Sequence, residues 1–126
     1  MAFKLSKAEN ATHQALINDL RAAQDSFTAA QEMESPDKEA VILRLAELCV
    51  AIEETERFRD EIASRFRDEF DEKSEKWQES DKADEANEFI GQWEDTSFDE
   101  PTLEDPMKDS LEEDWAQTLE DLPTEM

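Results

Sequence analysis

Oxygen-bearing side chains stand at alternate positions from residue 95 onward, in the spacing that begins a calcium-binding loop. Asp95, Ser97 and Asp99 match the first three ligands of such a loop. Glu100, however, occupies the position that requires glycine, and Pro106 stands where the final bidentate glutamate belongs. The match therefore fails, and we predict no metal and no cofactor for this chain.

A second acidic group, Glu53, Glu54 and Glu56, lies within a long helical pattern. It resembles the metal-binding helices of all-α nucleotide pyrophosphohydrolases, and this resemblance implies a metal-dependent hydrolase. That family needs a further glutamate where this chain has Arg57, and a second acidic motif on an apolar-backed helix downstream. Because the motif is broken, we predict a protein that is not an enzyme and has no catalytic residues, with the hydrolase kept as an alternative.

Nucleophilic catalysis has little support, because the sequence has only one histidine and one cysteine and no neighbouring residue that would activate either. His13 is the only histidine and Cys49 the only cysteine, and an activated thiol needs a basic neighbour. Cys49 lies on the apolar side of a predicted helix, where we expect it to pack as a small hydrophobic residue. One cysteine fits a reducing compartment, and the sequence has neither a signal-peptide pattern in residues 1–10 nor a run of roughly 20 apolar residues. We therefore expect a cytoplasmic protein.

The distribution of charge gives the strongest indication of function. The chain has 36 Asp or Glu against 13 Lys or Arg, a formal net charge of −23. Residues 81–126 carry 17 acidic residues and only two basic ones, Lys82 and Lys108, a net charge of about −15. A small domain needs a net charge of only about 2–8 to stay in solution. The excess predicts a basic partner of the kind that normally holds nucleic acid, whereas nucleic acid itself or an anionic membrane would be repelled.

These charges must be positioned by helices, because the apolar spacing is helical throughout. Ser6 and Glu9 form a capping-box pattern, and a stripe follows it along a predicted helix of about 27 residues: Leu16, Leu20, Ala23, Phe27 and Ala30. Ser35 and Pro36 then predict the start of a second helix that runs to about residue 79. Its stripe is Val41, Leu45, Leu48, Ile52, Thr55, Arg59, Ile62, Phe66, Phe70 and Trp77. The two stripes predict an all-α fold built on a long, coiled-coil-like antiparallel hairpin.

The two predicted helices differ in length. At about 1.5 Å per residue they span ~40 Å and ~66 Å, so the first covers the second only to about Ile62. A third helix over residues 81–94 can fold back over the remainder, a second copy of the chain can cover it as a homodimer through the second helix, or both can contribute. Acidic residues alternate with four arginines on this second helix, and we expect salt bridges along a solvated face, from Arg57, Arg59, Arg65 and Arg67.

The C-terminal region is predicted as a linker and a further helix. Residues 95–105 have linker composition, which divides the chain into a hairpin with a short third helix (1–94), the linker (95–105) and an acidic amphipathic helix with its tail (106–126). The last helix is capped by Asp105 and stopped by Pro123. Its apolar ridge either completes the core or anchors a partner, with Trp115 as the binding hot spot; the ridge comprises Met107, Leu111, Trp115, Leu119 and Leu122.

Two short stretches, residues 71–80 (DEKSEKWQES) and 89–94 (FIGQWE), resemble small acidic helical proteins encoded by bacteriophages and mobile elements. This resemblance implies an inhibitor of host defence, such as the DNA mimics that block restriction or CRISPR enzymes. Duplex DNA carries one charge per ~1.7 Å, whereas a single 46-residue helix with this charge would carry one per ~4.6 Å. Mimicry therefore requires the acidic segments to fold side by side.

Two functions follow from these patterns. The first is a non-enzymatic inhibitor that binds a nucleic-acid-binding host protein through carboxylates in the place of phosphates. The second is a coiled-coil dimeric adaptor or scaffold with an acidic solvating tail. For the first we predict these partner-binding residues: Asp84, Glu85, Glu88, Trp93, Glu94, Asp95, Glu112, Glu113, Asp114, Trp115, Glu120 and Asp121.

Overall fold

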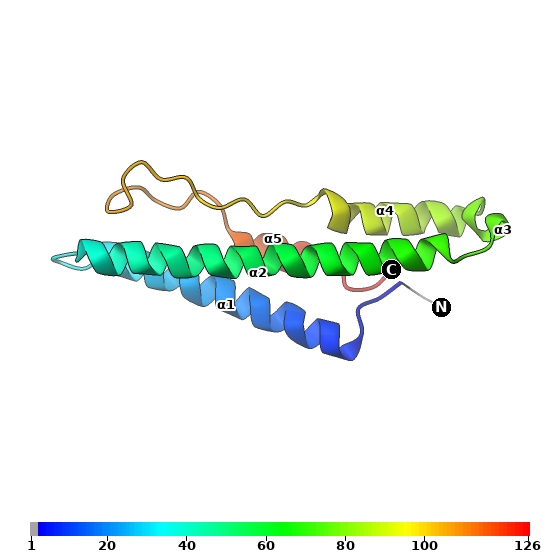
Figure 1. Cartoon of the computed structure of the whole chain (residues 1–126), viewed down its shortest axis with the longest axis horizontal. Coiled ribbons are helices and arrows are strands. Elements are labelled where there is room, and N and C mark those ends of the chain that lie inside the picture. The colour runs from blue at the N-terminus through cyan, green and yellow to red at the C-terminus, as the bar shows by residue number, and fades with distance from the viewer. Residues whose placement is uncertain (1–2) are drawn as a thin grey trace.

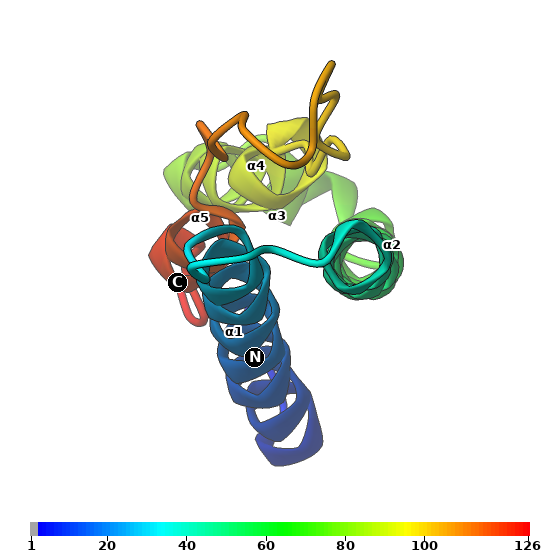
Figure 2. The same cartoon turned by 90° about the vertical axis from the view of Figure 1, so that its left-hand side faces the viewer.

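Five helices make up the fold in the computed structural model, which describes residues 3–126. They are α1 (Lys7–Gln31), α2 (Lys38–Asp71), α3 (Glu75–Gln78), α4 (Asp81–Asp95) and α5 (Trp115–Asp121). The long helices α1 and α2 form an antiparallel hairpin, and α4 returns alongside α2 (Figure 1). Seen along its length, the molecule has α2, α1, α5 and α4 grouped around a shared core (Figure 2). The predicted all-α fold with a long helical hairpin and shorter later helices is confirmed.

The helix ends follow local capping chemistry. At the start of α1 the predicted capping box is present: the Ser6 N–H donates to Glu9 Oε1 (2.8 Å) and the Glu9 N–H donates to Ser6 Oγ (3.1 Å). The predicted start of the second helix is wrong by two residues, because the Asp37 carboxylate accepts the Glu39 N–H and serves as the N-cap in place of Ser35.

The predicted end of the second helix, near residue 79, is also wrong. α2 ends at Asp71, and Ser74 caps a new short helix by accepting the Trp77 N–H (3.2 Å). The chain turns here because Trp77 packs back on Phe70 and Phe3, with ring centroids 5.5 Å and 5.9 Å away. This turn sends α4 back along α2.

The far half of α2 is covered within the same chain. Phe66 contacts Phe89 and Trp93 of α4, with ring centroids 5.0 Å and 6.5 Å apart. Ile62, Ala63, Phe66 and Phe70 are all buried. Of the two predicted ways to cover this stripe, the structure has the returning helix, so this half of α2 offers no apolar face to a second copy.

The two terminal segments add cover that the sequence patterns did not indicate. Phe3 and Leu5 are buried in the main core. The Leu5 N–H donates to the Thr124 carbonyl and the Met126 N–H donates to the Phe3 carbonyl, each at 2.8 Å. The two segments therefore pair as short antiparallel extended stretches against the helices.

Between α4 and α5, residues 96–114 form an irregular segment where a linker and the start of a helix were predicted. Phe98 is buried in the main core, so this segment is packed against the hairpin and separates no domains. The predicted helix from residue 106 is wrong: only residues 115–121 are helical. Gln31 of α1 holds the earlier part in a turn, because its amide donates to the Pro106 and Asp109 carbonyls (both 2.7 Å).

The predicted apolar ridge is consequently divided between two clusters. Met107 and Leu111 pack against a small cluster of Phe27, Ala30 and Val41. The remaining ridge residues lie in the main core: Trp115, Leu119 and Leu122. The ridge therefore completes the core.

Candidate acidic interaction surface

Two indole N–H groups join segments within the C-terminal third, and one imidazole nitrogen joins this region to α1 of the hairpin. Trp93 Nε1 donates to the Pro123 carbonyl, and Trp115 Nε1 donates to the Asp99 carbonyl, each at 2.8 Å. His13 Nε2 lies 2.8 Å from the Leu119 carbonyl, and because a carbonyl only accepts, this nitrogen must carry the proton. The acidic residues of this region are thus carried by segments whose other side chains are packed in the core.

The prediction that Trp93 and Trp115 contact a partner is wrong. Their exposed fractions are 0% and 2%, and both belong to the main core. Their indole N–H groups are already paired within the chain. A tryptophan on a periodic ridge has the same sequence pattern whether a core or a partner covers it, and here the core does.

Arginines of the hairpin hold α4 and α5 in place. Arg67 of α2 forms a two-pronged salt bridge with Glu94 (2.7 and 3.2 Å) and also donates to Asn87 (2.9 Å). Arg59 donates to the Thr96 carbonyl at the end of α4, and Arg21 of α1 pairs with Glu120. Two predicted partner-binding residues, Glu94 and Glu120, are therefore already engaged in salt bridges within the chain.

The expectation of a solvated arginine face on α2 is correct only in part. Arg65 pairs with Glu69 along the helix, but it also binds Glu9 of α1 through two nitrogens (2.7 and 2.5 Å). Burial alone would raise the pKa of Glu9, but the Arg65 and Ser6 hydrogen bonds and the Arg65 charge lower it below its ordinary value of 4.5.

We expect Glu9→Gln to destabilise the protein by about 1 kcal/mol near neutral pH, because it removes a partly buried ion pair. Because the pKa of Glu9 is lower in the folded state, its ionised side chain stabilises the fold at pH values above the unfolded-state pKa. This stabilisation is lost as the pH falls through the folded-state pKa. The difference in unfolding free energy between wild type and variant should therefore shrink below about pH 4.5. Urea denaturation of both proteins across this range measures it, with the exposed Glu54→Gln as control; a difference independent of pH would contradict the assignment.

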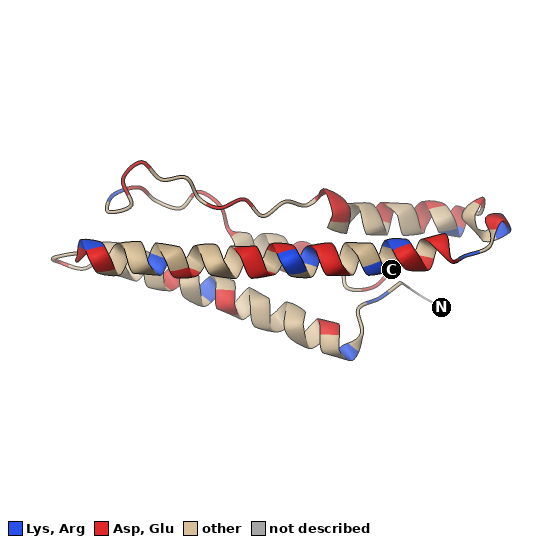
Figure 3. Cartoon of the chain, in the orientation of Figure 1, with Lys and Arg blue, Asp and Glu red and all other residues tan. Residues whose placement is uncertain are grey.

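The remaining predicted carboxylates form an exposed, unpaired set. On α4, the side chains of Asp84, Glu85, Glu88 and Asp95 are exposed and take part in no salt bridge within residues 3–126. The buried face of α4 carries only apolar residues, which confines the acids to its outer side. Figure 3 shows acidic residues along α4 and the segment that follows it, with few basic residues beside them.

Residues 112–114 and α5 extend this acidic surface. Glu112 and Glu113 are exposed and likewise unpaired within the described chain. Asp114 accepts the Gln117 N–H as the cap of α5, and Asp121 accepts from the Gln117 amide (2.8 Å). We define the acidic surface by its eight carboxylates free of salt bridges: Asp84, Glu85, Glu88, Asp95, Glu112, Glu113, Asp114 and Asp121.

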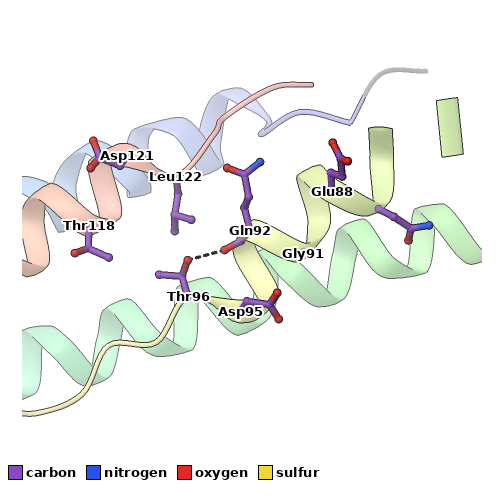
Figure 4. A pocket seen from close by; sticks show the side chains of 9 residues that line it. Glu88, Gly91, Gln92, Asp95, Thr96, Thr118, Asp121 and Leu122 are labelled. Carbon is purple, nitrogen blue, oxygen red and sulfur yellow. Dashed lines mark hydrogen bonds between the residues drawn. The ribbon is translucent and has the colours of Figure 1, made fainter. Parts of the chain in front are cut away.

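An open groove of about 790 Å³ lies within the acidic surface, between the C-terminal half of α4 and the end of α5 (Figure 4). Gly91 and Leu122 contribute to its wall, together with three carboxylates, those of Glu88, Asp95 and Asp121. No Lys or Arg lines it. The Thr96 hydroxyl is satisfied by the Gln92 carbonyl (2.6 Å). The groove thus offers apolar contact beside negative charge.

A second hollow of about 630 Å³ is lined by residues 99–104, 109–113 and 115. Glu100 at its edge comes close to the acidic group of α2: hydrogen bonding with Glu53, slight desolvation and the charges of Glu53 and Glu56 raise the pKa of Glu100. Within residues 3–126 no group of three or more Asp, Glu, His or Cys side chains is arranged to hold a metal ion. The hydrolase alternative gains nothing from this geometry.

The lone cysteine and the lone histidine are both packed against other parts of the fold. Cys49 is half-buried, and burial together with Glu100 and Glu53 raises the pKa of its thiol, which keeps it protonated. His13 is buried beside Phe58 and Trp93, with ring centroids 6.2 Å and 6.0 Å away. Neither residue lines either of the two hollows described above.

Comparison of the chain with protein-family models, with curated proteins and with solved structures gave no match. In the part of the chain that the structure describes, each helix lacks either the length or the apolar character needed to cross a membrane. Charge and shape are therefore the properties from which a function can be inferred. Both are concentrated on the acidic surface.

Proposed function

We propose that this protein is a non-enzymatic inhibitor that binds a nucleic-acid-binding host protein through the acidic surface. The observation that supports this function is a fixed layer of exposed carboxylates without cationic partners in the described chain, as on α4 with Asp84, Glu85 and Glu88. A tail that only keeps a protein in solution has no need of the buried tryptophans that hold this layer. In this function the protein acts in the cytoplasm of the host cell.

The spacing of the charges supports mimicry of a nucleic-acid strand. α4 has 15 residues and is ~22 Å long, and the acidic surface includes four of its carboxylates, those of Asp84, Glu85, Glu88 and Asp95. From residue 84 to residue 95 these four carboxylates correspond to one per ~4 Å of helix rise, near the ~3.4 Å between phosphates along one strand of a duplex. Such a surface attracts the Lys and Arg side chains of the partner and gains from the counterions that both release.

The test uses the protein as bait and then as competitor. The immobilised protein is incubated with bacterial lysate at low salt, and bound proteins are eluted with salt and identified. Each captured protein is purified, and displacement of its DNA or RNA is measured as the acidic protein is added. We expect nucleic-acid-binding proteins to be captured and their nucleic acid to be displaced; capture that is insensitive to salt would contradict the proposal.

A second function, the dimeric adaptor, is favoured by one observation on the first half of α2. Ile42, Leu43 and Val50 have exposed fractions of 46%, 54% and 53%. On a helix these residues lie away from the core side that holds Val41 and Leu48. They form the apolar part of α2 that remains available to a second copy.

Under this second function, we expect wild type to sediment as a dimer and the double variant Leu43→Glu/Val50→Glu to sediment as a monomer. Both side chains are half exposed, so the variant should keep its helical circular dichroism, and its free energy of unfolding should stay within about 0.5 kcal/mol of wild type. Glu47→Gln, between them on the same helix, is the control and should leave the dimer intact. A monomeric wild type at concentrations of about 100 μM would exclude the adaptor.

A further inference from the structure

The only glycine of the chain, Gly91, lies in the interior of α4 and in no turn. No glycine in residues 3–126 has a positive φ, so the backbone at Gly91 is ordinary helix that any residue can adopt. Glycine is the least favourable residue after proline in a helix interior. The helix therefore carries a destabilising residue that its own backbone geometry does not require.

Packing within the chain does not require it either. A Cβ atom built at Gly91 would have Asp95 Oδ2 as its nearest neighbour, at 3.9 Å, which is an ordinary van der Waals contact. The missing side chain leaves space in the wall of the groove between α4 and α5. An absent side chain at an open wall permits another molecule to approach the helix backbone closely.

The surroundings of Gly91 indicate what kind of group approaches. Glu88, Asp95 and Asp121 line the same groove and no basic residue does. Asp95 is exposed and forms no salt bridge in the described chain, and its carboxylate lies beside the open space over Gly91. Leu122, from the end of α5, supplies apolar surface in the same groove.

We propose that this groove receives an arginine side chain of the partner, with its guanidinium over Gly91 and against the Asp95 carboxylate. The apolar stem of arginine can lie along Leu122 while its charged end reaches the carboxylates. A planar guanidinium can lie flat on a helix that lacks a Cβ and bond a carboxylate through two nitrogens, which a lysine ammonium cannot do. This inference rests on the proposed function, and it specifies the residue by which the basic partner is recognised.

Gly91 also provides the means to test it, because a single glycine gives a single glycine amide resonance in the ¹⁵N-labelled protein. A blocked tetra-arginine peptide is titrated at low salt, with tetra-lysine and tetra-serine peptides for comparison. We expect the Gly91 resonance to shift with arginine, to shift at least threefold less with lysine, and to stay in place with serine. Equal shifts with arginine and lysine would overturn the assignment of arginine.

Two variants separate the groove from general charge. Asp95→Asn should weaken tetra-arginine binding at least fivefold, whereas Asp84→Asn, with the same change of charge on α4 but outside the groove, should weaken it less than twofold. Gly91→Ala should keep or raise the urea midpoint and weaken peptide binding at least threefold. An alanine variant that binds like wild type would overturn the proposal.

The failure of this inference differs from the failure of the proposed function. If the arginine peptide shifts resonances of the acidic surface but leaves Gly91 in place, the groove is not the binding site, and the wider surface can still bind a basic protein. If the peptide shifts no resonance at low salt, recognition of basic groups fails altogether, and both proposals are overturned.

Discussion

Replacing Trp93 with alanine is expected to lower the free energy of unfolding by about 3–5 kcal/mol, the usual cost of removing a large aromatic side chain from a core. Trp93 is completely buried and contacts His13, Phe58 and Phe66, with ring centroids 6.0–6.5 Å away. It also bonds the Pro123 carbonyl. Since domains of this size are stable by only about 5–15 kcal/mol, much of the variant should unfold at moderate urea concentrations.

Two controls identify the source of this loss. Trp93→Phe keeps an aromatic ring but removes the N–H that donates to Pro123, so it should cost less, about 1–3 kcal/mol. Trp77→Ala removes a tryptophan that is only partly buried and should likewise cost less than Trp93→Ala. Urea denaturation followed by circular dichroism measures all three. A decrease in the free energy of unfolding of less than about 1.5 kcal/mol for Trp93→Ala would show that this side chain is not held in the core.

Neutralising four carboxylates of α4 should have the largest effect on partner binding. The variant Asp84→Asn/Glu85→Gln/Glu88→Gln/Asp95→Asn removes charges that form no salt bridge in the described chain, so the fold should be retained. At about 0.5–1 kcal/mol for each exposed contact, the loss is about 2–4 kcal/mol, or roughly 30- to 1,000-fold in Kd. The dependence of log K on log salt should also become shallower by about 0.9 for each phosphate-like contact that is lost.

A matched variant distinguishes the acidic surface from the overall charge. Four exposed acids of the hairpin, neutralised together, change the net charge by the same amount: Asp19→Asn, Asp25→Asn, Glu34→Gln and Glu54→Gln. We expect this control to weaken binding to the captured partner by less than threefold when Kd is measured over a range of salt. Equal losses in the two variants would show that only total charge matters, and would refute recognition by this surface.

Helix existence could be predicted from the sequence because it depends on nearby residues. The pattern of Ser6 and Glu9 was sufficient to place the start of α1, since both partners of the capping box lie within one turn. The spacing of Leu16, Leu20 and Phe27 correctly indicated the buried face of this helix. The same reasoning failed at residues 106–114, because an amide from Gln31, distant in the chain, binds the carbonyls there.

The candidate site was predicted less completely, for a related reason. The acids of α4 could be placed on an outward face from the position of Ala86, Phe89 and Trp93. Which of them are free could not be predicted, because this depends on arginines that reach across from other helices, as Arg67 does to Glu94 and Arg21 does to Glu120. The role of Gly91 was also missed, although a lone glycine inside a strong helical pattern was the available signal.

The pairing of the two terminal segments bears on the kinetics of folding. The hydrogen bond between Leu5 and Thr124 joins residues about 120 positions apart, so almost the entire chain must be ordered before it forms. Such a contact carries a large loop-closure entropy and is expected to form after the rate-limiting step. Interactions absent from the folding transition state act mainly on the rate of unfolding. The short pairing at Lys4 and Glu125 would then slow the unfolding of the protein and leave its folding rate nearly unchanged.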